Sequence, residues 1–199
     1  MSKTVDYYFA PQSPWTYLGH ERFAAMSEKA GATVRVLPVD LGRVFPVSGG
    51  LPLPKRAPQR QAYRLQELGR FSNHLRLPMN IQPKYFPVSG DDAAKLIIAV
   101  DLHDGAAQAM RMAGAILTAC WAQERNIASE VTLTEILQAL SLPAERIEQA
   151  HNQATQERYD IDTQRAIEIG VFGAPTYVVD GEMFWGQDRL DFVERKLMT

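Results

Sequence analysis

The stretch of sequence that decides the fold reads Val5-Asp6-Tyr7-Tyr8-Phe9-Ala10-Pro11-Gln12-Ser13-Pro14-Trp15-Thr16-Tyr17-Leu18. Its first residues are mostly aromatic or β-branched and stop before Pro11, which predicts a buried strand. A helix should begin directly afterwards, because Ser13 is a favourable N-cap and Pro14 suits the first helical position. A second strand is predicted over residues 33–39, so the order strand, helix, strand favours a parallel βαβ unit.

Helical patterns then occupy most of the chain, after a loop at 45–53 that is rich in proline and glycine. Thr132 and Glu135 have the form of a capping box, and Pro143 stands where a proline at the first helical position belongs. Helices are expected over 60–75, 91–102, 106–124, 133–140 and 144–170, the last with a break near 159–162. Two strands, 176–179 and 182–185, should flank a hairpin turn at Asp180-Gly181, and a helix over 189–197 ends the chain.

This order resembles an α/β, thioredoxin-like fold (βαβ…αββα) with a large all-helical insertion. We expect a thioredoxin-like domain formed by residues 1–45 and 165–199. Residues 46–164 would form the helical insertion domain.

The composition is that of an ordinary globular chain and excludes disorder and collagen. The 199 residues are 46% hydrophobic and 22% charged, with a formal net charge of −2. Such a charge provides no field to attract nucleic acid or an anionic membrane, and the apolar run 113–122 is too short to span a bilayer. Because residues 1–6 lack the apolar segment of a signal peptide, we expect a cytoplasmic location.

The cysteine and histidine residues indicate neither a disulfide nor a metal site. Cys120 is the only cysteine, and its apolar helical surroundings predict a small core residue. The histidines have no mutual spacing typical of metal ligands, so no metal is expected at any of them: His20, His74, His103 and His151.

Ser13 occupies the place where a thioredoxin-fold protein carries its Cys-x-x-Cys motif, and both cysteines are absent. The free N–H groups and positive dipole end of a helix N-terminus would still favour a thiolate brought by a ligand. A purely structural N-cap role for Ser13 is the alternative.

The segment 170–177 places Pro175 at the start of a strand, after a loop flanked by glycines. In this fold such a proline is typically cis and lies beside the first helix. The backbone of Ala174 would then be free to pair with an extended, peptide-like ligand. The alternative is a proline that is merely tolerated at a strand edge.

Four segments together resemble the 2-hydroxychromene-2-carboxylate isomerases, relatives of the kappa-class glutathione transferases within the DsbA-like branch. They are 9–18, which contains Ser13-Pro14-Trp15; Val39-Asp40-Leu41-Gly42-Arg43-Val44; Glu157-Arg158-Tyr159-Asp160; and 170–190, which ends Phe184-Trp185-Gly186-Gln187-Asp188-Arg189-Leu190. The resemblance covers nearly the whole chain.

The resemblance implies glutathione as cofactor and a role for several residues. Ser13 would hold the glutathione sulfur as a thiolate, Ala174 would pair its backbone with the cysteinyl part, and Gln187 with Asp188 would receive the γ-glutamyl end. An ionised Asp188 suits an ammonium partner, although an acid in the first turn of the last helix also stabilises the helix dipole. Pro175, Trp185 and Arg60 are also expected to bind the cofactor.

The substrate half of the predicted site is less well matched. Relatives carry a lysine where this chain has Phe45 and an asparagine where it has Gly50. The basic run 55–60 contains Lys55 and Arg60, either of which could bind a carboxylate, although such runs are usually solvated surface. Trp15 could line an aromatic pocket, and Asn80 and Tyr85 lie in a loop that the family folds over its substrate.

The function implied is a cytoplasmic, homodimeric isomerase of an aromatic carboxylate in aromatic compound catabolism. The reaction would convert 2-hydroxychromene-2-carboxylate to trans-o-hydroxybenzylidenepyruvate, or a related pair, through reversible thiolate addition. A kappa-like glutathione transferase or peroxidase and a non-catalytic thioredoxin-like binding module remain alternatives. The sequence does not distinguish isomerase from transferase activity and does not identify the physiological substrate.

Overall fold

The computed structural model describes residues 3–199, whose centre is one four-stranded sheet of order β2-β1-β3-β4. The strands β1 and β2 pair in parallel, β3 pairs antiparallel with β1, and β4 pairs antiparallel with β3, as the predicted order requires. The strands are β1 (Thr4–Phe9), β2 (Thr33–Pro38), β3 (Thr176–Val179) and β4 (Glu182–Trp185). The prediction that residues 1–6 lack a signal-peptide segment includes Met1 and Ser2, which lie outside the described residues.

Aromatic side chains hold the first helix to the sheet. Tyr7 of β1 lies opposite Tyr177 of β3, and their rings stack with centroids 5.4 Å apart. Phe23, on helix α1 (Pro14–Lys29), packs against both rings at 4.6 and 4.7 Å. All three side chains are fully buried, so this contact fixes the start of α1 relative to the C-terminal end of β1.

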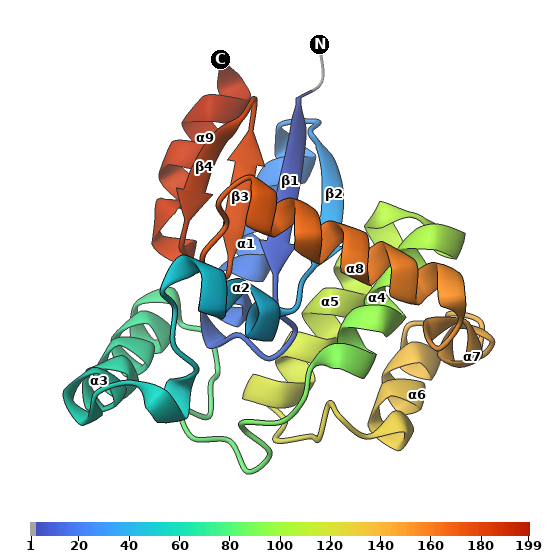
Figure 1. Cartoon of the computed structure of the whole chain (residues 1–199), viewed down its shortest axis with the longest axis horizontal. Coiled ribbons are helices and arrows are strands. Elements are labelled where there is room, and N and C mark those ends of the chain that lie inside the picture. Colours follow the sequence, from blue (N-terminus) through green and yellow to red (C-terminus); the bar gives the residue numbers. More distant parts are fainter. Residues whose placement is uncertain (1–2) are drawn as a thin grey trace.

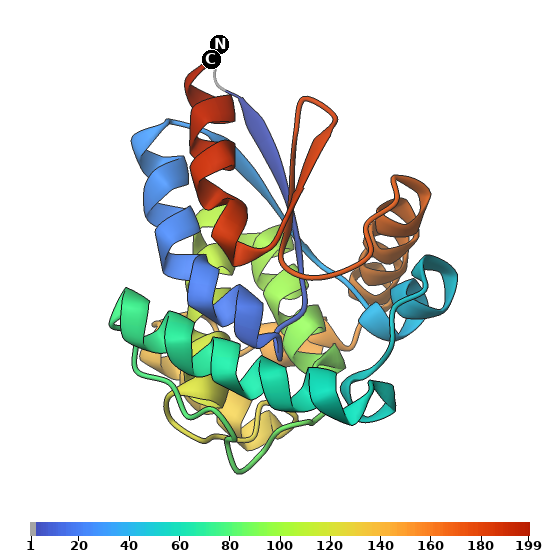
Figure 2. The same cartoon turned by 90° about the vertical axis from the view of Figure 1, so that its left-hand side faces the viewer.

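The helices surround the sheet on both faces. Figures 1 and 2 show α1 and α9 against one face and α8 across the other, with α2 and α3 beyond the end of the sheet. The helices after α1 are α2 (Leu41–Ser48), α3 (Pro58–Leu75), α4 (Asp91–Asp104), α5 (Ala106–Trp121), α6 (Glu130–Ala139), α7 (Arg146–Ala150), α8 (Gln153–Glu168) and α9 (Leu190–Met198). No helix in the described range is both long and apolar enough to cross a membrane.

The prediction of a loop over 45–53 is wrong for its first half, which belongs to α2. The Asp40 side chain caps this helix by accepting a hydrogen bond from the Gly42 N–H at 2.7 Å. Gly49 ends it in the left-handed conformation, at φ +75°. Because these caps stabilise both ends, the eight-residue helix tolerates Pro46, which removes one internal hydrogen bond.

Other predicted helix boundaries also need correction. The break in 144–170 lies at 151–152, because the Asn152 side chain accepts a hydrogen bond from the Thr155 N–H at 2.9 Å and so starts α8. The expected break at 159–162 is instead spanned by an ion pair of Arg158 and Asp162 at 2.6 Å. Helix α6 follows Ser129, so Thr132 is inside it and forms no capping box. Pro143 precedes α7 rather than occupying its first position.

The division into a thioredoxin-like domain and a helical insertion stays a prediction. Its first boundary, at 45/46, falls inside α2, and its second, at 164/165, falls inside α8. Both helices are anchored to each other, since Arg43 of α2 pairs with Asp160 of α8 at 2.7 Å.

Candidate functional site

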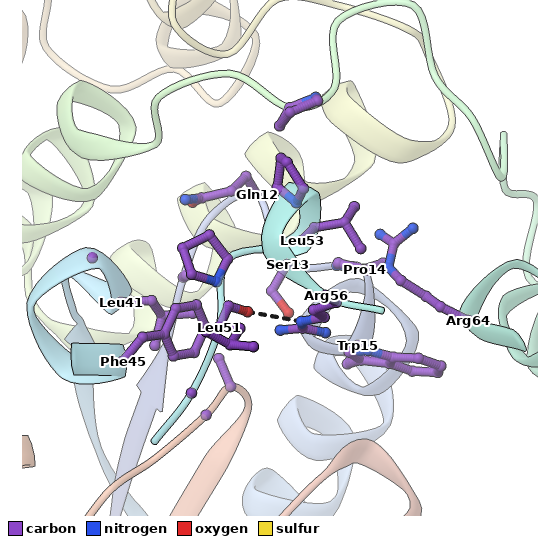
Figure 3. Close-up of a pocket in the computed structure, with 18 of the residues that line it drawn as sticks. Gln12, Ser13, Pro14, Trp15, Leu41, Phe45, Leu51, Leu53, Arg56 and Arg64 are labelled. Carbon is purple, nitrogen blue, oxygen red and sulfur yellow. Dashed lines mark hydrogen bonds between the residues drawn. The ribbon is translucent and has the colours of Figure 1, made fainter. Parts of the chain in front are cut away.

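A cavity of about 770 Å³ lies where the start of α1 meets α2, the short 3₁₀ helix η1 (Leu53–Lys55), α3 and the loop before β3. Figure 3 shows Ser13, Pro14 and Trp15 entering it from α1, with Phe45 of α2 across from them and Arg64 reaching in from α3. The fold thus brings together the segment 10–15, residues between 41 and 64, and Phe172, Gly173 and Ala174 from the other end of the chain. Ser13, Trp15, Phe45, Arg60, Ala174 and Trp185 are the predicted site residues on its lining.

Ser13 is the N-cap of α1, as predicted, and it also faces the cavity. Its Oγ accepts a hydrogen bond from the Thr16 N–H at 3.2 Å. A hydroxyl has one donor and two acceptor positions, so the cap leaves the Ser13 hydrogen available to a ligand. The structural role and a role in binding are therefore compatible.

The loop before β3 presents unpaired backbone to the same cavity. The Ala174–Pro175 peptide bond is cis, as predicted. Hydrogen bonds on either side hold the loop, from Thr176 Oγ1 to the Gly173 carbonyl at 2.7 Å and from the Gly186 N–H to the Pro175 carbonyl at 2.9 Å. Within residues 3–199 the N–H and C=O of Ala174 form no hydrogen bond, so both remain available to an extended ligand.

Trp185 forms the wall of the cavity beside this loop. A Cβ added at Gly173 would lie 2.5 Å from the Trp185 Nε1, which shows how closely the indole covers the loop. The Phe172 and Trp185 rings pack with centroids 4.7 Å apart. Because no side chain larger than hydrogen fits at Gly173, the glycine keeps this wall in place.

The charge of the cavity is positive. Among the lining residues that the structure describes, three are arginines and none is aspartate or glutamate. Arg56, Arg60 and Arg64 are spaced four residues apart, a spacing that places side chains on one face of a helix. Burial and the nearby charge of Arg56 lower the Arg64 pKa to about 10. Of these three arginines, only Arg60 is a site residue predicted from the sequence. The four-residue spacing is the signal that could have indicated Arg56 and Arg64.

Phe45 and Gly50, the two departures from the isomerase pattern, lie against each other in the cavity wall. A Cβ added at Gly50 would be 2.4 Å from Phe45 Cδ1 and 3.2 Å from Phe45 Cβ. Residue 50 therefore has no room for a side chain while Phe45 keeps its position, and the two departures form one structural change. The Arg56 guanidinium lies over the Phe45 ring, 6.0 Å from its centroid.

Several predicted site residues do not line the cavity. Lys55 is exposed, and the Asn80 backbone N–H donates to the Trp121 carbonyl at 2.7 Å. Tyr85 lies beneath the Lys84 ammonium, 5.1 Å from it. Pro175 also lies off the lining, although its peptide bond shapes the loop. The roles proposed for these residues stay predictions.

Gln187 and Asp188 lie next to the cavity wall rather than on it. Gln187 is only 2% exposed, and its Oε1 accepts a hydrogen bond from Arg22 of α1. Asp188 is half exposed and pairs with the neighbouring Arg189 at 2.7 Å. Asp188 is therefore the residue of the two whose side chain, a carboxylate, is accessible to a ligand that extends past Trp185.

Comparison with known proteins agrees with the fold and with the resemblance read from the motifs. Residues 4–198 match the family model of the DSBA-like thioredoxin domain. The chain belongs to this family. A curated relative, the 2-hydroxychromene-2-carboxylate isomerase of Pseudomonas putida, is 29% identical over 194 residues, which cover 96% of this chain and 92% of that protein.

Two further proteins are similar to this chain over most of their length. The glutathione S-transferase kappa 1 of Caenorhabditis elegans is 24% identical over 95% of this chain and 88% of its own length. A solved structure of a 2-hydroxychromene-2-carboxylate isomerase superposes with a TM-score of 0.81 at 28% identity, covering 98% of this chain and 94% of that one. The predicted resemblance to the isomerases and to the kappa-class transferases is thus confirmed.

Proposed function

We propose that this protein is a glutathione-dependent isomerase of an aromatic carboxylate, of the type that converts 2-hydroxychromene-2-carboxylate to trans-o-hydroxybenzylidenepyruvate. The observation that carries the proposal is the joint placement of the Ser13 hydroxyl and the unpaired Ala174 backbone on one positively charged cavity. The names of the curated relatives supply the reaction.

The residues of the cavity fit a small thiol peptide. Ser13 would donate its free hydrogen to the sulfur, and the N-terminal end of α1 would add the positive end of its dipole, so the ionised sulfur is favoured over the neutral thiol. Ala174 would pair its N–H and C=O with the cysteinyl backbone. Arg60 would bind the glycyl carboxylate, and Asp188 would receive the γ-glutamyl ammonium.

Glutathione would supply a thiolate that adds reversibly to the side-chain double bond of the substrate, permits rotation, and leaves again unconsumed. The protein holds this sulfur at Ser13 and excludes water with apolar walls. Trp15 is placed to contact the substrate ring, and its own ring packs edge-on against Phe71 at 6.1 Å. We propose a homodimer in the cytoplasm as the working form.

A titration of bound glutathione tests the proposal. The thiolate absorbance near the ultraviolet edge, followed against pH, should give a lower thiol pKa for glutathione bound to the wild type than for free glutathione. Because a hydrogen bond to a charged group is worth about 1.5–3 kcal/mol, Ser13→Ala should raise the bound pKa by about 1–2 units. The lost cap should lower the free energy of unfolding by only about 0.5–2 kcal/mol.

Ser48→Ala is the matched control, because Ser48 also lines the cavity but lies on α2. Its curve should coincide with that of the wild type. Identical curves for wild type and Ser13→Ala would refute the role of Ser13.

A glutathione transferase is the second candidate, favoured by the kappa-class relative. The two activities differ in whether glutathione disappears during turnover. A binding module without catalytic activity would show neither turnover nor glutathione affinity.

A further inference from the structure

Arg64 is a half-buried cation with an unusual environment. It projects from α3 into the cavity, where its guanidinium lies 5.2 Å from the centroid of the Phe86 ring and 5.8 Å from that of Trp121. Stacking on aromatic faces stabilises a guanidinium. Such stacking provides no hydrogen-bond acceptor for the N–H donors at the edge of the guanidinium.

No acid among residues 3–199 forms an ion pair with this charge. The Arg64 Nη2 is buried and has no hydrogen-bond partner in the described chain, and no ion pair of Arg64 forms there. Two other arginines of the chain with largely shielded side chains, by contrast, pair with a carboxylate: Arg146 with Asp104 at 2.7 Å, and Arg158 with Asp162 at 2.6 Å. Because burying an unpaired charge is costly, Arg64 is the arginine on which an anionic ligand gains most.

We propose that Arg64 binds the carboxylate of the aromatic substrate and is the residue that makes this cavity select acids over their neutral analogues. The proposal rests on the proposed function for the identity of the substrate. Arginine binds a carboxylate best through two parallel N–H donors, and Arg64 lies on the cavity lining with no carboxylate partner among residues 3–199. Phe86, the one of its two aromatic neighbours that lines the cavity, suits the flat ring that the carboxylate would carry.

The other two arginines are less suited to this role. Arg56 Nε already donates to the Leu51 carbonyl at 2.8 Å, as the dashed line in Figure 3 marks. Arg60 is exposed, so water solvates its charge and competes with a ligand. Figure 3 shows the Arg64 side chain extending toward the start of α1, the end of the cavity that holds Ser13.

Binding of a substrate-like pair of probes tests the assignment without glutathione. Calorimetry would compare trans-2-hydroxycinnamate with its uncharged amide, which has the same ring and double bond. The wild type should bind the acid at least about tenfold more tightly than the amide, a difference of about 1.4 kcal/mol. Arg64→Gln should remove this preference by weakening the acid alone, and Arg64→Lys should restore part of it.

Arg70→Gln is the matched control, since Arg70 lies on the same helix but is exposed and pairs with Glu67. It should keep the full preference, as should Arg60→Gln. If Arg64→Gln does not fold, as judged by circular dichroism, Arg64→Met keeps an apolar stem of similar length and removes the charge together with its N–H donors.

A wild type that does not prefer the acid, or a preference that survives Arg64→Gln and Arg64→Met, would overturn the assignment. Loss of the preference in Arg60→Gln with Arg64 intact would also overturn it. Failure of glutathione to bind, with the Arg64-dependent preference retained, would instead refute the proposed function and leave the carboxylate site standing.

Discussion

Replacing Gly50 with alanine should destabilise the protein through one contact, that with Phe45. The added Cβ would lie 2.4, 3.0 and 3.2 Å from Cδ1, Cγ and Cβ of Phe45. These atoms include the stem of the side chain as well as the ring, so a rotation of the ring alone does not relieve the overlap. The backbone of Gly50 is not left-handed, so alanine introduces no strain of its own there.

The size of the effect follows from these distances. Overpacking of this kind costs about 1–3 kcal/mol, which Gly50→Ala should show as a lower free energy of unfolding in urea. In a Phe45→Ala background the approaches to Cδ1 and Cγ are gone and only the 3.2 Å approach to the Cβ remains, so the same change should be neutral or stabilising by about 0.4–1 kcal/mol through the unfolded chain. The double-mutant cycle should therefore give a coupling energy of about 1–4 kcal/mol between positions 45 and 50.

Gly49→Ala provides the matched control beside it. Gly49 has φ +75° and nothing within 4 Å of an added Cβ, so alanine there costs about 1–2 kcal/mol in backbone strain. This cost should be the same with and without Phe45, which gives a coupling energy near zero. A coupling of less than about 0.5 kcal/mol between 45 and 50 would mean that Phe45 moves aside freely, and the explanation of the paired departure would fail.

Two further predictions concern Asp188 and Cys120. Asp188→Asn should weaken glutathione binding, measured by calorimetry, by about 0.5–1.5 kcal/mol. This is less than the loss of a buried charge-assisted hydrogen bond, because the Asp188 side chain is 46% exposed. An equal loss of binding in Asp191→Asn, on the neighbouring helix turn, would indicate a general charge effect instead. Burial raises the Cys120 pKa to about 12, so at pH 8 roughly one molecule in ten thousand carries the thiolate. Iodoacetamide should therefore leave the folded protein unmodified and label the urea-unfolded chain once; rapid labelling of the folded protein would contradict the burial.

The sequence alone predicted those features that depend on residues close together along the chain. The Ser13 cap of α1 needs only the Thr16 N–H three positions away. The hairpin turn needs only two adjacent residues that adopt positive φ, as Asp180 and Gly181 do at +51° and +79°. The order of strands and helices follows from patterns of the same short range, and so does the place of the predicted thiol site at the start of α1.

Family resemblance extended the prediction to the loop before β3, including the cis bond before Pro175. It did not fix which side chains of the neighbouring segment reach the cavity. Gln187 has the expected place in the sequence, yet Arg22 of α1, 165 residues away, holds its side chain amide oxygen. That contact exists only because α1 and the segment after β4 lie on the same face of the sheet.

The features that only the tertiary structure decided depend on segments that are distant in the sequence. The placement of helix α2 against α8 is such a feature: the Asp40 N–H, at the start of α2, donates to Thr163 Oγ1 of α8 at 3.1 Å. Arg64 becomes a half-buried cation without an ion pair among residues 3–199 because Phe86 and Trp121 approach it from 22 and 57 positions further along the chain. Local patterns encode caps, turns and periodicity, whereas burial and charge pairing arise only when the chain folds and determines which groups lose their water.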